Sequence, residues 1–547
     1  MTRESPDSEY LSGTDNAWFR MGDRTNRMII TAVLFFEEPV TYEELESQLE
    51  KRLLPFKRFR QRIVKPWHRL RPKWKIDDEF NIDAHLTHVA LPEPAGEEEL
   101  QRFVAETMDK DLDRSRALWH GWLVEWAGDD GNGGNALVVR IHHALGDGFA
   151  LLYVLLGLAD DPAAIDMPLG DVPPPPGMED EEWARERAKA IGDSDEEDEV
   201  TGRTRQDETL YGSEGVKDGT DEAEDGKEQD DEGATETETD QEGDEKEDEE
   251  DAKDSRSPLS SIRNAVSMGA NMAKIGYSSL TLSREPKTSL RGDLGLTERV
   301  SWTESYDTEK VKQVGDVYGG TINDVLMSAT AGAFRRYLIE NGEDVPEDLD
   351  LRCAVPVNLK PLEERTEELG NYFGLGFLQL PVGVEDPQER MRMIQDRTGM
   401  LKQGTEAYLM YLSLALVGAL PRFVQSLVLR RFHNRMTAAV TNVPGPKESF
   451  EFAGKTVKDI KFWVPRSEDI GIGISIFSYD GSVRVGVAAD EGLVSEPEKL
   501  AESFNDEMET IFEDAGVEVD GKNEKDEEEE QDETEAEESE VTTAEDD

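Results

Sequence analysis

A long acidic stretch, residues 179–257, decides how this chain can fold. It holds about 35 acidic against 10 basic residues and very few aromatic or branched apolar ones. A segment of this composition cannot bury enough apolar surface to offset the entropy lost on folding, so we expect it to be disordered. The 547-residue chain is therefore predicted to fold as two halves joined by an acidic linker.

The charge pattern gives four segments. We expect a folded half over residues 8–160, an acidic disordered linker over 161–257, a second folded half over 258–515 and an acidic disordered tail over 516–547. The formal net charge of −62 falls to about −24 when the acidic stretch 179–257 and the acidic C-terminal residues 521–547 are set aside. The remaining acidity is typical of a salt-adapted protein, and the total charge argues against both nucleic acid and anionic membrane as partners for the bulk of the molecule.

Hydrophobic periodicity predicts a mixed α/β fold on both sides of the linker. In the first half, the predicted strands are 27–38, 119–127 and 135–143, and the predicted helices are 41–54, with Thr41 as N-cap, and 97–112. In the second half, we expect strands at 298–306 and 351–359, helices at 259–280 and 321–342, and a hairpin over 469–490 that turns at Asp480-Gly481.

Cysteine usage and the apolar runs bear on where the protein works. The single cysteine, Cys353, lies in a predicted strand, and we expect it to be a buried core thiol. The longest apolar run, residues 407–420, is shorter than the ~20 residues that a spanning helix needs. Its continuation to residue 432 is read as a buried core helix or, alternatively, as a helix that seeks a membrane surface. No signal peptide is recognised, so we expect a cytoplasmic protein with a peripheral membrane position as the alternative.

One predicted strand ends in two adjacent histidines, His142 and His143, followed by Asp147 between two glycines. Strand alternation turns only one of the two imidazoles toward a given cleft. A neutral imidazole can take a proton from a hydroxyl when a second group fixes its tautomer. A lone histidine pair is more often structural, and no third metal ligand stands at a recognised spacing. The full spacing His-His-three residues-Asp-Gly, between a strand and an apolar helix, favours a catalytic corner in which Gly148 leaves room for a substrate.

This segment resembles the HHxxxDG motif of the CoA-dependent acyltransferase superfamily, and its surroundings resemble the bacterial wax ester synthase/diacylglycerol acyltransferase family. Further similar segments follow in order between residues 11 and 490: LSGTDNAWF, RALWHGWLVE for the Pro-Leu-Trp motif, GGTINDVLMSA for the Asn-Asp motif, LGNYFG, TNVPGPKESFEFAGKTV and ISIFSYDGSVRVGVAAD. The chain departs from the family pattern at Ala117, which stands where the Pro-Leu-Trp motif has proline, so we expect a less rigid loop there. The acidic insert and tail are also outside the usual pattern.

The resemblance implies an α/β fold of two chloramphenicol-acetyltransferase-like sandwich subdomains around a central substrate tunnel. Acyl-CoA would enter as a substrate from one side, and a diacylglycerol or fatty alcohol from the other, with no metal and no further cofactor. His143 would be the general base, with His142 and Asp147 in support, and Asp147 would hold the loop through a structural salt bridge rather than act in a triad. The motif residues implied in substrate binding are Leu118, Trp119, Asn323, Asp324, Thr441 and Asn442.

Several of these assignments leave alternatives open. Thr441 and Asn442 are candidates for the donor to the oxyanion, but Asn442 could equally cap a turn before Pro444. Asn323 and Asp324 open a predicted helix, where capping is the commoner role. Two other functions also remain: transfer from a carrier-bound thioester, which the absence of a carrier domain disfavours, and a non-catalytic lipid-binding or scaffold role, which the intact HHxxxDG motif disfavours.

Overall fold

The computed structural model describes residues 8–22, 25, 27–65, 71–127, 134–167, 174–176, 178, 180–191, 285–359, 369–403, 410–412, 435–466 and 470–518. All of them belong to one compact unit, formed by Met1–Ser213 and Leu282–Asp547. The predicted helix 259–280, nearly all of the apolar run 407–432, and most of the acidic linker and tail lie outside the described residues. Within the described ranges, no helix is long and apolar enough to cross a bilayer.

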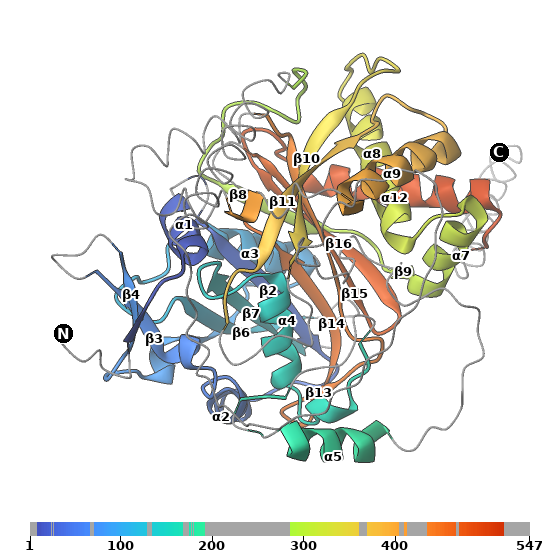
Figure 1. Ribbon diagram of the computed structural model, residues 1–547. Coiled ribbons are helices and arrows are strands. Elements are labelled where there is room, and N and C mark those ends of the chain that lie inside the picture. The colour runs from blue at the N-terminus through green and yellow to red at the C-terminus, as the bar shows by residue number, and fades with distance from the viewer. Residues whose placement is uncertain are drawn as a thin grey trace, which may run out of the picture. The chain divides into compact units, whose positions relative to one another are not determined.

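The described residues form a mixed α/β structure with two large sheets (Figure 1). The strands are β1 (Ser8–Tyr10), β2 (Ile29–Phe36), β3 (Gln61–Val64), β4 (Lys73–Ile76), β5 (Leu86–Ala90), β6 (Trp119–Trp126), β7 (Gly134–His142), β8 (Glu298–Trp302), β9 (Tyr306–Asp307), β10 (Leu351–Asn358), β11 (Phe373–Leu380), β12 (Ala438–Pro444), β13 (Glu451–Phe452), β14 (Lys455–Trp463), β15 (Ile472–Tyr479) and β16 (Ser482–Asp490). The α-helices are α1 (Gly13–Met21), α2 (Tyr42–Arg52), α3 (Glu97–Met108), α4 (Gly148–Gly157), α5 (Asp180–Ile191), α7 (Thr308–Tyr318), α8 (Ile322–Glu340), α9 (Pro387–Gln403) and α12 (Pro497–Ala515). Short 3-10 helices are η1 (Lys57–Arg60), η2 (Ile82–Ala84) and η3 (Pro162–Ala164).

The first large sheet carries the double histidine and has the strand order β13-β14-β2-β7-β6-β5. The predicted hairpin is present, since β7 pairs antiparallel with β6 and, on its other edge, with β2. Residues of α2 and α4 pack in one core cluster with Leu34 and Leu137, while α3 packs with Val33 and Val138, which alternate to the opposite face. The sheet is therefore covered by apolar side chains on both faces.

Strands β13 and β14 cross between the two halves of the sequence. They lie far beyond the acidic linker, yet β14 pairs antiparallel with β2, with Trp463 opposite Thr31. The first sheet is thus completed by residues of the second half, an arrangement that the sequence prediction did not contain.

The second large sheet has the order β11-β10-β12-β15-β16-β8, with β9 paired to β16. Its apolar side chains share one core cluster with α7, α8, α9 and α12, and Figure 1 shows α8, α9 and α12 lying together beside this sheet. Cys353 on β10 is fully buried in that cluster, as predicted, and burial raises the pKa of its thiol.

Local sequence signals position several of these elements. Thr41 and Thr321 each cap a helix through a capping box, with Glu44 and Asp324 as the reciprocal partners. The β15–β16 hairpin turns where expected, with φ values of 50° at Asp480 and 68° at Gly481.

The start of the predicted disordered linker differs from the prediction, because residues 180–191 form α5. Trp183 on this helix is buried in the first core cluster, and Arg187 donates hydrogen bonds to the carbonyls of Ala163 and Ile165. The high acidic content of the stretch predicted disorder throughout. Trp183 and Arg187 nevertheless anchor a helix within it. The other domain boundaries remain a prediction.

Candidate active site

His143 lies just after β7, at the side of a cavity of about 90 Å³. Its backbone N–H donates to the Met28 carbonyl at 2.8 Å, which fixes the chain at the end of the strand. Its ring stacks on Trp18, with centroids 4.6 Å apart, and lies 5.5 Å from the ring of Phe373. The imidazole is therefore held between aromatic side chains from α1 and β11, and its freedom to rotate is small.

Hydrogen bonds fix the tautomer of His143. Its Nδ1 lies 2.8 Å from Oδ1 of Asn371. The orientation of that amide is set by its nitrogen, which donates to Oδ1 of Asp15 and to the His143 carbonyl, both at 2.9 Å. Because the amide oxygen can only accept, Nδ1 carries the hydrogen and Nε2 keeps its lone pair free. His143 is thus arranged as a proton acceptor.

The surroundings of His143 favour its neutral form. Burial lowers the pKa of His143 from its usual 6.5, although Asp147, Asn371 and Asp15 act in the opposite direction. Burial likewise raises the pKa of Asp15, while the Arg58 guanidinium opposes that change. At neutral pH the imidazole is therefore available as a base.

His142 faces the other way, as strand alternation predicts. It is buried near Phe19, with ring centroids 5.9 Å apart, and it does not line the His143 cavity. Its Nδ1 accepts a hydrogen bond from the backbone N–H of Ala144 at 3.1 Å. Burial lowers the pKa of His142 to about 3. This imidazole is a neutral structural group that shapes the turn after β7.

Asp147 holds the loop after the histidines through hydrogen bonds to backbone amides. Its Oδ1 accepts from Ala150 N–H at 2.8 Å and caps α4, and its Oδ2 accepts from Tyr372 N–H at 2.7 Å. The second bond ties the HHxxxDG loop to the residue that follows Asn371. Both contacts are made to the peptide backbone, and the salt bridge predicted for Asp147 stays a prediction.

The two candidate oxyanion donors point to opposite faces of β12. Thr441 lines the cavity of His143. The next residue, Asn442, lies outside it and donates from Nδ2 to Oδ1 of Asn323 at 3.2 Å. Asp324 accepts from Thr321 and, at 2.9 Å, from Oγ1 of Thr398. The structure thus brings Thr441 to His143 and places Asn442 and Asn323 together on the other side of the strand.

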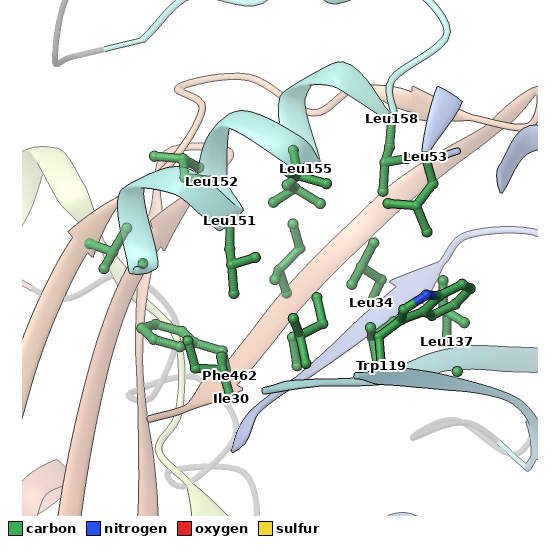
Figure 2. Close-up of a pocket in the computed structure, with 18 of the residues that line it drawn as sticks. Ile30, Leu34, Leu53, Trp119, Leu137, Leu151, Leu152, Leu155, Leu158 and Phe462 are labelled. Carbon is green, nitrogen blue, oxygen red and sulfur yellow. The ribbon is translucent and has the colours of Figure 1, made fainter. Parts of the chain in front are cut away.

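The Pro-Leu-Trp-like segment lies at a second, apolar cavity of about 130 Å³. Trp119 lines it and donates from Nε1 to the Phe59 carbonyl at 2.9 Å, while Leu118 is fully buried in the surrounding core. Figure 2 shows Leu151 and Leu155 of α4, and Leu158 just after the helix, lying across this cavity from apolar side chains of the first sheet. The apolar cavity adjoins the His143 cavity, since four residues line both: Ile30, Gly148, Val443 and Val464.

Sequence reasoning did not assign Asn371, Asp15 or Trp18 to the site. Their segments, LGNYFG and LSGTDNAWF, were noted only as similar to a family. Asn371 is 228 residues from His143 along the chain, and 356 from Asp15. No local spacing can reveal contacts of that range, so the resemblance of the two segments was the only signal available.

Comparisons with known proteins identify the family of the chain. Residues 11–196 match the family model described as the wax ester synthase/diacylglycerol acyltransferase catalytic domain, and residues 369–512 match the WS/DGAT C-terminal domain. A probable diacylglycerol O-acyltransferase of Mycobacterium tuberculosis is 26% identical over 490 residues, covering 88% of this chain and 91% of the relative. A putative diacylglycerol O-acyltransferase of the same species is 28% identical over 487 residues, covering 86% and 88%.

Two solved structures share the fold. A wax ester synthase/diacylglycerol acyltransferase from Marinobacter aquaeolei superposes with a TM-score of 0.57 at 16% identity, covering 93% of this chain and 99% of that one. A trichothecene 15-O-acetyltransferase from Fusarium sporotrichioides gives a TM-score of 0.54 at 11% identity, covering 92% and 95%. Of the site residues, His143 and Asp15 lie in the first matched range, and Asn371 and Thr441 lie in the second.

Proposed function

The chain belongs to the wax ester synthase/diacylglycerol acyltransferase family, and from this premise we propose that it transfers a long-chain acyl group from acyl-CoA to the hydroxyl of diacylglycerol or a fatty alcohol, with His143 as general base. Its activity is O-acyl transfer, and its products are triacylglycerols or wax esters. The observation that carries the assignment of the base is the hydrogen bond between Nδ1 of His143 and Asn371, which leaves Nε2 free beside the cavity.

The reaction needs one base and no covalent enzyme intermediate. Nε2 of His143 takes the proton of the acceptor hydroxyl as its oxygen attacks the thioester carbonyl. The tetrahedral intermediate collapses, the carbon–sulfur bond breaks, and the imidazolium returns its proton to the leaving CoA thiolate. Asn371 and the Asp15 carboxylate beyond it support the transient imidazolium through their hydrogen bonds.

Thr441 is the group that we assign to the developing oxyanion. It lines the His143 cavity from β12. A hydroxyl in that position can donate to the charge that forms on the carbonyl oxygen. Asn442 and Asn323 are assigned instead to holding β12 against the start of α8, through the bond between their side chains.

The apolar cavity is the proposed place of the acyl chain. All of its lining residues are apolar apart from the indole N–H of Trp119, which is already bonded to a carbonyl. A flexible hydrocarbon gains free energy on leaving water in such surroundings, at about 25 cal/mol per Å² of buried apolar area. Because this cavity adjoins that of His143 at Gly148 and Val443, a chain held there can present its thioester to the base.

Purified full-length protein, in molar potassium chloride, would be incubated with radiolabelled acyl-CoA of graded chain length and a panel of acceptors. We expect CoA release matched by triacylglycerol or wax ester, with long chains preferred over acetyl-CoA. If acyl transfer occurred only from a carrier-bound thioester and not from acyl-CoA, this proposal would be wrong and the carrier-dependent alternative would be supported. Lipid binding without turnover would support a non-catalytic role.

The acceptors are membrane lipids or long alcohols, so we further propose a cytoplasmic enzyme that works at the membrane surface. The support is the chemistry of the substrates. The apolar segment that could make the contact lies outside the described residues.

The first prediction concerns Asn371 as a positioning residue. Asn371→Ala removes the acceptor that fixes the Nδ1–H tautomer, and we expect kcat to fall by about 10- to 100-fold while KM changes little. Since the hydrogen bond to Asn371 raises the pKa of His143, its loss should also move the acidic limb of the kcat profile to lower pH.

Asp15→Asn is the matched control, because the amide oxygen can still accept from Asn371 while the charge is lost. It should retain more activity than Asn371→Ala. Equal losses in kcat, with unchanged pH profiles for both variants, would show that the two residues act only in packing.

A further inference from the structure

A small polar cavity of about 20 Å³ lies behind the sheet that carries His143. It is distinct from the two cavities described above, although it shares the lining residue Val464 with both and Pro465 with the His143 cavity. Arg27, Arg140 and Arg466 converge on it together with one carboxylate, that of Glu298. We propose that this cavity binds a chloride ion, and that the ion stabilises the contact between the two halves of the fold.

Polar atoms without partners gather around this cavity. Oγ1 of Thr31, Nε of Arg140, Nε of Arg27 and Oε2 of Glu298 are all buried without a hydrogen bond, and all belong to its lining residues. Nε of Arg27 lies 3.3 Å from Asp111, and Oε2 of Glu298 can only accept. Buried polar groups are otherwise nearly always paired, so the two remaining donors, Nε of Arg140 and Oγ1 of Thr31, indicate a bound acceptor.

The charges around the cavity favour an anion over a water molecule. Arg466 pairs with Glu298, and Arg27 with Asp111 at 3.3 Å. Arg140 is 1% exposed and, among the described residues, forms no ion pair; its one hydrogen bond goes to the Met108 carbonyl at 3.3 Å. A water would leave the charge of Arg140 offset only by the nearby carboxylates of Asp111, Asp109 and Glu298, and a buried charge that is incompletely offset is costly.

The pKa of Arg140 also favours an anion in this cavity. Burial lowers the pKa of Arg140 to about 9, and Arg27 adds to that effect. The carboxylates of Asp111, Asp109 and Glu298 oppose the shift without cancelling it. A monovalent anion beside Nε would supply the missing charge.

The size of the cavity selects the occupant. A volume near 20 Å³ holds one species about as large as water, since a single water needs roughly 10–15 Å³ of this kind of space. Chloride fits such a small space more readily than sulfate, phosphate or a carboxylate does. The ligand class is therefore a halide.

The position of the site explains what the ion would do. Arg27, Thr31 and Arg140 belong to the first half of the chain, and Glu298 and Arg466 to the second. Anything that binds the assembled site and not the unfolded chain stabilises the folded state by mass action. Arg140 also stands two residues before His142 on β7, so the ion would support the strand that positions the catalytic turn.

The test compares anions at one fixed, high ionic strength, with full-length protein. Thermal unfolding would be followed while potassium glutamate is replaced stepwise by potassium chloride. We expect Tm to rise by several degrees and to saturate with chloride concentration. Arg140→Met should abolish the saturable part, and Thr31→Val should move its midpoint to higher chloride. Arg299→Met is the control, because this arginine on neighbouring β8 pairs with Glu491 and does not line the cavity.

A structural measurement decides the matter even if Arg140→Met fails to fold. Crystals of the wild-type protein grown in sodium bromide should show an anomalous peak between Nε of Arg140 and Oγ1 of Thr31. Electron density of a water without anomalous signal, or a chloride effect equal in wild type, Thr31→Val and Arg299→Met, would overturn the proposal. Neither result depends on the proposed acyl transfer.

Discussion

Replacing His143 with alanine is expected to reduce kcat by about 10³-fold or more, whereas His142→Ala should retain a measurable fraction of wild-type turnover. The two side chains are adjacent in sequence, but they have different surroundings. His143 lines the cavity with its Nε2 free, and His142 is turned into the protein, where it accepts from the Ala144 N–H. We therefore propose that only the first exchanges a proton with a substrate.

The measurement is the rate of ester formation from saturating acyl-CoA and acceptor, with folding of each variant checked by circular dichroism and thermal unfolding. His142→Ala serves as the control, because it removes an imidazole of equal size from the same turn. That variant should lose stability, since it empties a buried position. A folded His143→Ala enzyme with wild-type turnover, or a His142→Ala enzyme as inactive as His143→Ala, would contradict the mechanism.

The pH dependence of the activity is a second test of His143. Because burial lowers the pKa of His143, the basic form is present at neutral pH and persists somewhat below pH 6.5. The activity should fall on the acidic side of that value, as the imidazole becomes protonated. The same pH profile would be measured on the residual activity of His143→Ala. An acidic limb at the same pH in this variant would assign the titration to another group.

The parts of the site that the sequence predicts are those built from neighbouring residues. The spacing from His142 to Gly148 places a strand end, a turn and a helix start, and the structure has all three. The caps at Thr41 and Thr321 follow from side chains that reach backbone groups three residues away. Such contacts are short in sequence, so a pattern can encode them.

Other parts depend on which face of an element is turned inward. Thr441 and Asn442 are adjacent on β12, so only one of them can face His143. The sequence could not choose, because both faces of this strand are buried and neither shows a polar–apolar alternation. The pairing of β14 with β2 was equally out of reach, since it joins segments on either side of the acidic linker.

The largest effect that we expect on stability comes from salt. Outside the two acidic segments the chain keeps a net charge of about −24, so carboxylates repel one another across its surface at low ionic strength. The Debye length is about 30 Å at 0.01 M and about 3 Å at 1 M, so repulsion over most of the molecule is removed in molar salt. We propose that the protein is salt-adapted, and we expect it to unfold or lose activity in dilute buffer and to recover in molar potassium or sodium chloride.

The buried ion pairs should not be weakened by the added salt. Glu507 is buried between Arg390 and Arg336, so bulk ions have little access to this cluster. Buried pairs are screened far less than exposed charges. Added salt should therefore weaken the surface repulsion without weakening the contacts that join α8, α9 and α12.

The measurement is thermal unfolding across a salt series, on the full-length protein and on a variant that lacks residues 193–254 and 519–547. The deleted segments have too little apolar content to contribute to a core, so the variant should fold, transfer acyl groups and show the same direction of salt dependence. Repeating the series with potassium glutamate separates screening, which any salt provides, from the chloride site, which only halides fill. A Tm that is independent of salt in both proteins would reject salt adaptation and leave the acidity of the folded part without a role in stability.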